Sequence, residues 1–280
     1  MNVAITGASG FVGSRLTQRL QAEGHATRAI SLRSAVAPDA LAGFDAVVNL
    51  AGENIAQKWT PAAKRRIRES RITGTRALVA AMRAQPPAVL VSVSAVGYYG
   101  SRRDEVLTER SKPGADFLAQ VCAEWEREAM AAAMTGVRVA LLRTGMVLGA
   151  EGGALPRMLP PFKLGVGGRL GSGTQWMSWI HIADLCDLIW FALREPTVSG
   201  PLNATSPNPV SNADFTRALA RVLHRPALFP VPAFALKLIF GEMAEVLLGS
   251  QRAVPDAALH AGFVFQHPEI GAALRSLLAT

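Results

Sequence analysis

The chain has 280 residues, of which 50% are hydrophobic and 18% charged, and this length corresponds to about two domains. The composition excludes a disordered protein, and no run of about 18 uncharged apolar residues predicts a membrane span. The 29 Lys and Arg residues outnumber the 21 Asp and Glu residues, so a net charge of +8 indicates an anionic partner.

Cysteine usage and the N-terminal segment bear on the compartment. Cys122 and Cys186 lie within helical patterns and are expected to be buried free thiols, because two cysteines cannot build a disulfide scaffold. The first five residues have no basic region and no small-residue cleavage site, so no signal peptide is predicted. We therefore expect a cytoplasmic location, and the histidine spacing predicts no metal site.

The first elements predict a strand, a glycine-rich turn and a helix. Residues 3–5 form a β-rich run, and apolar residues at helical spacing extend from the turn to Glu23. Between them the glycines follow the spacing G-x-x-G-x-x-G, which brings the backbone and a helix N-terminus close to a pyrophosphate. The predicted dinucleotide contacts here are Gly7, Ser9, Gly10, Phe11, Val12 and Gly13.

The end of the second predicted strand indicates which dinucleotide binds. Residues 25–30 form this strand, and no acidic residue occurs between Glu23 and Asp39. A carboxylate at this point favours NAD(H), whereas Ser31 and Arg33 would hydrogen-bond and neutralise a 2′-phosphate. The sequence therefore favours NADP(H) over NAD(H), with an ordinary exposed arginine as the alternative for Arg33.

The third predicted strand, 45–50, and the basic helix after it are the next elements expected to lie near the adenosine part of the cofactor. Small residues after the strand let the backbone approach the ribose and the pyrophosphate. The helix from Lys64 to Arg76 is densely basic but contains no aromatic residue, so a solvated face is expected and nucleic acid is not. Arg71 is the exception that we assign to a phosphate contact. The predicted cofactor contacts in this region are Leu50, Ala51, Gly52, Glu53 and Arg71.

Five motifs occur together in one order. T-G-A-S-G-F-V-G at 6–13 precedes N-L-A-G at 49–52, Ser-Val-Ser at 92–94, L-R-T-G-M-V-L-G at 142–149 and W-I-H-I-A-D-L at 179–185. Together they resemble the extended and atypical short-chain dehydrogenase/reductases. The resemblance is closest to a branch of epimerase-like proteins of unassigned substrate, and it covers essentially the whole chain.

This resemblance implies an α/β fold: a Rossmann domain with a doubly wound parallel sheet, and a smaller C-terminal α/β substrate domain. The Rossmann domain would span 1–150 with 176–203 returning to it, and the substrate domain 151–175 and 204–280. Further cofactor contacts are implied at Ser92, Arg143, Thr144 and Met146, with a salt bridge inside the sheet as the alternative for Arg143.

The chain departs from the catalytic pattern that the resemblance implies. Such proteins use a hydroxyl after the fourth strand and a Tyr-x-x-x-Lys pair on the next helix. Here Asp116 and Gln120 stand in the places of that pair. The candidates for proton transfer are therefore Ser94, Tyr98 or its neighbour Tyr99, and Asp116. Each has a structural alternative: a turn hydrogen bond for the serine, loop packing for the tyrosines and a helix N-terminus for Asp116.

The second half predicts the substrate side. The irregular, glycine-rich segment 149–173 is expected to form a substrate lip, in which Lys163 and Arg169 either meet an anionic substrate or remain exposed. His181, before a helix over 182–194, is assigned a structural role. Ser211 is expected to be the N-cap of a helix that runs through His224. The stretch 232–248 is predicted to be helical, and one set of its apolar residues is expected to pack within the domain or against the cofactor domain, with a dimer face left open. This set is Ala233, Leu236, Ile239, Phe240, Met243 and Leu247.

Two functions remain open at this stage. The first is an NADP(H)-dependent oxidoreductase or epimerase-like enzyme acting on a small carbonyl or sugar substrate, and an anionic substrate would suit the basic lip. The second is a non-catalytic NADP(H)-binding redox sensor or assembly factor. We expect a monomer or homodimer that binds neither nucleic acid nor a membrane.

Overall fold

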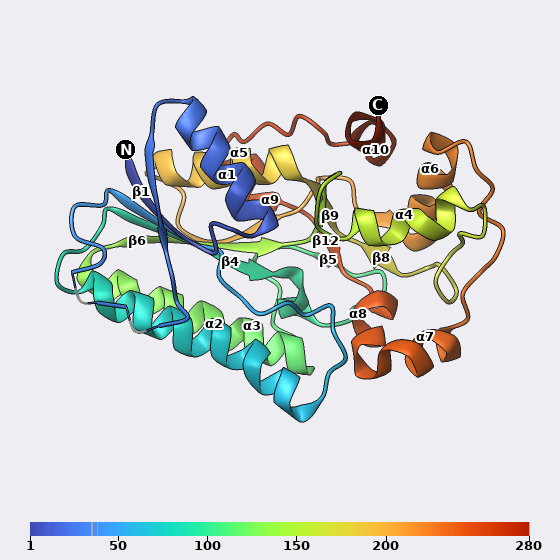
Figure 1. The fold of residues 1–280 in the computed structure, drawn as a ribbon, viewed down its shortest axis with the longest axis horizontal. Helices are drawn as coiled ribbons and strands as arrows, with labels where there is room; N and C mark the ends of the chain where they lie inside the picture. The colour runs from blue at the N-terminus through green and yellow to red at the C-terminus, as the bar shows by residue number, and fades with distance from the viewer. Residues whose placement is uncertain (35, 38, 280) are drawn as a thin grey trace.

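The central element is a six-stranded parallel sheet, seen in a computed structural model that describes residues 1–34, 36–37 and 39–279. The strand order is β10-β6-β4-β3-β1-β2 (Figure 1). The strands are β1 (Asn2–Thr6), β2 (Ala26–Ile30), β3 (Ala46–Asn49), β4 (Val89–Ala95), β6 (Arg138–Thr144) and β10 (Gly200–Ala204). Because β1 lies between β2 and β3, the chain order reverses there, and such a switch point is where doubly wound sheets bind ligands.

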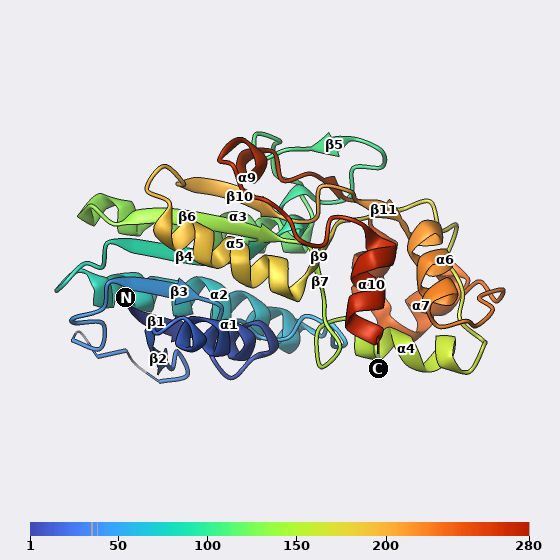
Figure 2. The ribbon, with the colours of Figure 1, turned by 90° about the horizontal axis from the view of Figure 1, so that it is seen from above.

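Helices cover both faces of the sheet, so the inner strands β1, β3, β4 and β6 are mostly buried and apolar, whereas the edge strand β2 is largely exposed. Helices α1 (Phe11–Ala22) and α5 (Ile182–Arg194) lie on one face, and α2 (Pro61–Met82) and α3 (Phe117–Met130) on the other (Figures 1 and 2). Separate clusters of buried side chains fill the two interfaces. This arrangement is the predicted Rossmann-type α/β fold.

The remaining elements gather beyond the carboxyl ends of the sheet strands (Figure 2). The helices of this second region are α4 (Leu155–Lys163), α6 (Asn212–Val222), α7 (Ala233–Phe240), α8 (Ala244–Leu248) and α10 (Ile270–Leu278). Helix α9 (Asp256–His260) lies beside β10. Three small two-stranded sheets connect the two parts: β5 (Val106–Leu107) with β12 (Arg252–Ala253), β7 (Met146–Leu148) with β9 (Trp179–His181), and β8 (Trp176–Met177) with β11 (Val210–Ser211). The loops of this region therefore face the switch-point edge of the sheet.

Local capping explains several element boundaries. Ser211 caps α6 by accepting a hydrogen bond from the Asp214 amide, as its position before an apolar periodic run predicts. The apolar stretch 232–248 is not one helix, because Gly241, with φ +59°, interrupts it between α7 and α8. Within the set expected to pack inward, the expectation is wrong for Ala233, which is exposed, and for Ile239, which is 64% exposed.

Both cysteines are buried free thiols, as expected, and burial raises the pKa of each to about 12. Such thiols are inert at neutral pH. Across the described ranges, no helix is both long enough and apolar enough to cross a membrane.

Candidate functional site

The glycine-rich turn between β1 and α1 has the geometry of an anion site. Gly7 has φ +67°, and a Cβ there would lie 2.9 Å from the Leu50 carbonyl group, so the turn packs directly against the end of β3. A Cβ on Gly13 would overlap the Gly7 carbonyl oxygen, so only glycine lets α1 sit this close to the turn.

The amides of the first helical turn are left without helical acceptors. Gly10 is the N-cap and provides no side-chain cap, and the first hydrogen bond of the helix runs from the Ser14 amide to the Gly10 carbonyl, 2.8 Å. A Cβ on Gly10 would meet only the Gly7 oxygen, at 3.2 Å, so its outer side is open. The turn is therefore a cradle that a phosphate could enter and that an alanine side chain would fill.

The Phe11 side chain packs in a place that the sequence did not predict, among the glycines of the lip. Its ring is enclosed by the glycine-rich lip, because Cβ atoms on Gly149 and Gly152 would overlap it. Only the backbone of Phe11 therefore belongs to the open cradle. The ring ties the predicted substrate lip to the first turn of α1.

A buried hydroxyl that sequence reasoning missed fixes the ends of β1 and β3. The Thr6 Oγ1 donates to Asn49 Oδ1, 2.7 Å, and accepts from the amides of Leu50 and Ala51 at 3.1 and 3.2 Å. Asn49 in turn donates to the Ser92 hydroxyl, 3.2 Å, which is buried. Ser92 thus lies inside the protein, where its hydroxyl supports Asn49 and, through Asn49 and Thr6, the loop after β3. This geometry favours a structural role for Ser92 over a direct contact with the cofactor.

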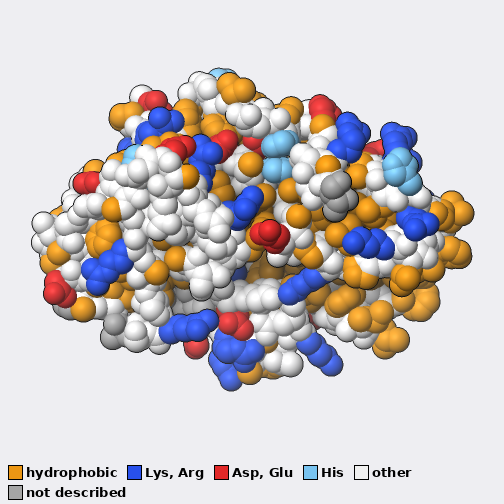
Figure 3. Space-filling model, turned by 45° about the horizontal axis from the view of Figure 1, so that its top comes forward, with side chains coloured by type: hydrophobic (Ala, Val, Ile, Leu, Met, Phe, Trp, Pro, Cys, Tyr) orange, Lys and Arg blue, Asp and Glu red, His pale blue; other side chains and the backbone are white. Residues whose placement is uncertain are grey.

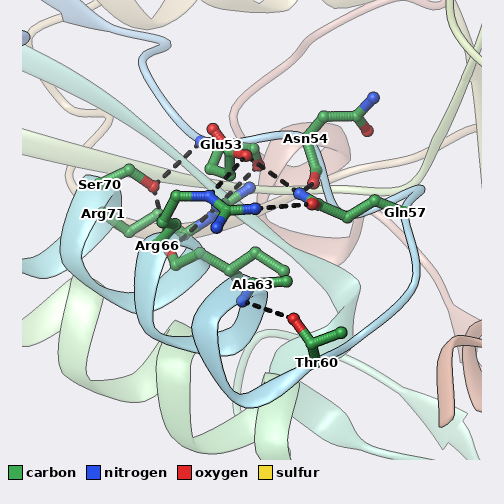
Figure 4. A network of polar contacts seen from close by, with 9 residues as sticks. Glu53, Asn54, Gln57, Thr60, Ala63, Arg66, Ser70 and Arg71 are labelled. Atoms are coloured by element: carbon green, nitrogen blue, oxygen red, sulfur yellow. Dashed lines mark hydrogen bonds and ion pairs between the residues drawn. The ribbon is translucent and has the colours of Figure 1, made fainter.

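The loop after β3 is held by a polar network on α2 (Figure 4). The Glu53 amide donates to the Ser70 hydroxyl, 3.0 Å, and its carboxylate accepts from Gln57, 3.1 Å. That hydrogen bond, together with Arg66 3.5 Å away, lowers the pKa of Glu53. The Glu53 side chain is therefore held as a carboxylate toward α2.

Arg71 lies beneath this loop. Its Nη1 donates to the carbonyls of Glu53 and Ile67 at 3.0 and 3.2 Å, and a Cβ on Gly52 would touch its guanidinium at 3.1 Å. Burial lowers the pKa of Arg71 without discharging it at neutral pH. The structure thus brings the predicted Arg71 and Gly52 together at the switch point.

The loop after β2 presents the residues assigned to the 2′-phosphate. Ser31 and Arg33 are both exposed, and the Arg33 amide donates to the Ser31 hydroxyl, 3.3 Å. Leu32 between them packs on α2 at Gly74. The packing anchors the loop while both polar side chains remain accessible.

Ser94, a predicted catalytic residue, belongs to a buried ion-pair network. Its hydroxyl donates to Glu126 Oε1, 2.8 Å, on α3. Arg143 donates to both oxygens of the same carboxylate, at 2.9 and 2.8 Å. Burial alone would lower the pKa of Arg143, but pairing with Glu126 outweighs it and raises the pKa. The structure thus favours the salt-bridge alternative for Arg143, and Glu126 is a member that sequence reasoning missed.

The two tyrosines have different surroundings. The Tyr99 hydroxyl is buried, donates to Asn203 Oδ1 at 2.6 Å and accepts from Arg143 at 3.1 Å. Burial raises the pKa of Tyr99 to about 12, so this phenol does not ionise at neutral pH. Tyr98 is half-buried, and the Arg143 guanidinium lies 3.5 Å from its ring centre. The loop-packing alternative therefore fits Tyr99.

Asp116 is the catalytic candidate that reaches open space. Its Oδ1 caps α3 by accepting from the Ala119 amide, 2.9 Å, as the alternative interpretation expected. Its Oδ2 points toward Gly100, where a Cβ would lie 2.9 Å away. Asp116 lines a cavity of about 500 Å³ with Tyr99, Gly100, Ser101, Arg102, Pro113, Gly114 and Ala115. The carboxylate thus has one oxygen bound to the helix and the other beside Gly100, which also lines this cavity.

The chain after β6 passes the same edge. The Thr144 hydroxyl donates back to the Leu142 carbonyl, 3.2 Å, and the Met146 amide donates to the Ser178 carbonyl, 2.8 Å. Both side chains are half-buried beside the switch-point edge. Lys163 and Arg169 in the lip are exposed.

His181 has the structural surroundings that the sequence suggested. Its Nδ1 accepts from the Ala183 amide, 3.0 Å, and its ring stacks on His267 with centroids 3.8 Å apart. Burial, then His267 and Arg15, lower the pKa of His181 to about 4, so it is neutral at pH 7. In the first turn of α5, Asp184 accepts hydrogen bonds from the amides of Gln266 and His267 and anchors the segment before α10.

Comparisons with known proteins agree with this geometry. The curated protein "Epimerase family protein Mb2239" of Mycobacterium bovis is 46% identical over 288 residues, covering 97% of this chain and 96% of that protein. A crystal structure of human epimerase family protein SDR39U1 with NADPH has a TM-score of 0.92 and 36% identity over the full length of both chains. A nucleoside-diphosphate sugar epimerase from Corynebacterium glutamicum has a TM-score of 0.83 and 38% identity, covering 99% of this chain and 58% of that one.

Family models divide the chain into two matched regions. Residues 231–277 match a domain of unknown function, DUF1731. Residues 3–204, which contain the central sheet except for the first residue of β1, match the model of the NAD dependent epimerase/dehydratase family. The chain belongs to the NAD dependent epimerase/dehydratase family and is an atypical, epimerase-like short-chain dehydrogenase/reductase.

Proposed function

We propose that this protein binds NADP(H) at the carboxyl edge of the sheet. The observation that carries the proposal is the open cradle at Gly10, where the amides of the first turn of α1 are free to receive a pyrophosphate. Ser31 and Arg33, exposed after β2, would bind the 2′-phosphate. The NADPH in the human relative's structure supports the choice of cofactor.

The function that follows is an NADP(H)-dependent oxidoreductase or epimerase-like reaction on a small carbonyl or sugar substrate. The bound nicotinamide supplies hydride transfer. The chain must then supply a group that takes the proton of a substrate hydroxyl when hydride leaves and returns a proton when a carbonyl receives hydride. Asp116, which lines a cavity, is the candidate. Oδ1 stays bound to the Ala119 amide, so the carboxylate orientation is fixed while Oδ2 takes up the proton.

The capping role of Asp116 makes a sharp test possible. Asn and Asp cap helices almost equally well, so Asp116→Asn keeps the cap and removes the base. Cofactor turnover of the purified protein with a panel of carbonyl and sugar compounds is the measurement. We expect Asp116→Asn to retain NADPH binding and thermal stability while turnover falls about 100-fold or more. Full turnover by Asp116→Asn would overturn the assignment of Asp116.

A second function is favoured by one observation. The hydroxyl of Ser94 is engaged by Glu126 inside the protein and is not presented to a substrate. An NADP(H)-binding redox sensor or assembly factor needs no such hydroxyl. Tight NADPH binding without turnover across the panel, together with a partner protein whose binding depends on the NADPH/NADP ratio, would select this function over the enzyme.

A further inference from the structure

Two loops and one helix form an exposed apolar surface on the C-terminal region. The segments 164–171 and 226–233 run side by side, joined by hydrogen bonds from the Phe229 amide to Gly167 and from the Val231 amide to Arg169. Helix α7 begins directly after the second segment. The apolar residues exposed here, which we call the apolar tip, are Leu164 (78%), Val166 (53%), Leu228 (77%), Phe229 (59%), Phe234 (74%), Leu238 (86%) and Ile239 (64%).

This concentration is unusual for a surface. Single exposed apolar residues are common, but a contiguous group of aliphatic and aromatic side chains marks an interaction site. Only Leu236 of α7 is fully buried, so this helix is held by little of its own apolar surface. Figure 3 shows hydrophobic side chains gathered at the right-hand end of the molecule, with Lys and Arg side chains among them.

The charge around the apolar tip is predominantly basic. Residues 152–183 and 215–241, which include both loops and α7, contain seven Lys or Arg residues and no Asp or Glu. They therefore contribute +7 of a net charge of +8 for the whole chain. Two acidic residues flank the second stretch, Asp214 paired with Arg217 and Glu242 paired with Lys64. Lys163, Arg225 and Lys237 are exposed, and each lies within three positions in sequence of a residue of the apolar tip.

The charge decides which partner fits. In a symmetric dimer the same patch faces itself, so Lys163, Arg225 and Lys237 would face basic residues of the second copy, with no acidic residue of either stretch between them. Single-stranded nucleic acid binds through aromatic stacking, whereas five of the seven tip residues are aliphatic. Exposed aliphatic side chains with basic side chains nearby fit the interface of a bilayer that contains anionic lipids.

We propose that the apolar tip docks this protein peripherally on an anionic lipid surface. The aliphatic side chains enter the boundary between headgroups and acyl chains, and Lys163, Arg225 and Lys237 contact lipid phosphates. This proposal departs from the expectation, drawn from the sequence, that no membrane is a partner. It does not depend on the proposed cofactor or reaction.

The test is flotation of the full-length protein with vesicles of phosphatidylcholine alone and with about one third phosphatidylglycerol. We expect binding to the anionic vesicles only, weakened by salt. The variant Lys163→Gln/Arg225→Gln/Lys237→Gln is expected to bind about 100-fold more weakly, and Leu238→Ser/Ile239→Ser about tenfold or more.

Matched controls distinguish the effect of the tip residues on vesicle binding from the effect of losing the same charge or apolar surface elsewhere on the protein. Arg28→Gln/Arg65→Gln/Arg83→Gln removes the same charge from exposed positions elsewhere, and Met134→Ser/Val264→Ser removes two exposed apolar side chains, 91% and 78% exposed. Both should bind nearly as the native protein does. The proposal is overturned if the native protein ignores anionic vesicles, if the controls lose as much binding as the tip variants, or if Leu238→Ser/Ile239→Ser instead abolishes self-association in sedimentation.

Discussion

Glu126 and Arg143 form a buried, bidentate ion pair between α3 and the end of β6, with N–O distances of 2.9 and 2.8 Å. The Glu126 carboxylate also accepts from Ser94, so one acidic side chain holds both a predicted catalytic hydroxyl and a predicted cofactor contact. The Arg143 side chain is only 4% exposed and that of Glu126 9%, so each charge depends on the other for compensation inside the protein.

Removing the charge of Glu126 should therefore be costly. Glu126→Gln leaves the Arg143 guanidinium buried without a counter-charge, and we expect a loss of about 3 kcal/mol in the free energy of unfolding by urea. Glu128→Gln is the matched control, since Glu128 on the same helix makes a bidentate pair with Arg76, whose side chain is 62% exposed. That exposed pair should contribute less than about 1 kcal/mol. Equal losses in the two variants would contradict the importance of burial here.

The glycine-rich turn predicts two alanine variants with different outcomes. Gly10→Ala adds a methyl group that meets only the Gly7 oxygen, at 3.2 Å, so stability should change little. The methyl group would nevertheless occupy the phosphate cradle, and NADPH affinity by isothermal titration should fall more than about tenfold.

Gly13→Ala is expected to lower both stability and affinity, because its Cβ would overlap the Gly7 backbone and push α1 away from the turn. The control is Gly74→Ala in the middle of α2, where the added Cβ makes ordinary contact with Leu32 at 3.4 Å. This variant should be neutral or slightly stabilising, since alanine favours a helix. Unchanged melting of Gly13→Ala would argue against the close packing described for the turn.

Arg33 provides a test of cofactor choice. Arg33→Ala should weaken NADPH binding about tenfold and leave NADH binding nearly unchanged, because only NADPH carries the 2′-phosphate. Arg28→Ala, within β2, is the matched control and should affect neither cofactor. An equal loss of NADPH and NADH affinity in Arg33→Ala would refute the role given to this side chain.

The sequence could predict what local spacing determines. The turn at Gly7, Gly10 and Gly13 and the cap at Ser211 follow from residues within one or two helical turns of each other. Glu126 could not be identified, because its partners Ser94 and Arg143 are 32 and 17 positions away and only the fold brings them together. Ile239 was misplaced for a related reason: an apolar residue in a helical pattern does not show whether another element covers it.

His181 makes the stability of the protein depend on pH. Its pKa falls from 6.5 to about 4 on folding, so the unfolded state binds a proton that the folded state does not between these values. The stabilisation is therefore complete above about pH 6.5 and is lost as the pH falls toward 4, by an amount on the order of 2 kcal/mol. The measurement is the urea unfolding free energy at about pH 7 and about pH 4.5.

His181→Asn separates this effect from the other titrating groups. Asparagine can still accept the Ala183 amide hydrogen bond at the start of α5, but it does not titrate. Other groups whose pKa changes on folding, including Asp184, titrate in both proteins, so their effects on stability cancel in the comparison. The variant should lose less stability between the two pH values than the native protein does. If both lose the same amount, then His181 is not the group that responds, and burial does not lower its pKa as described.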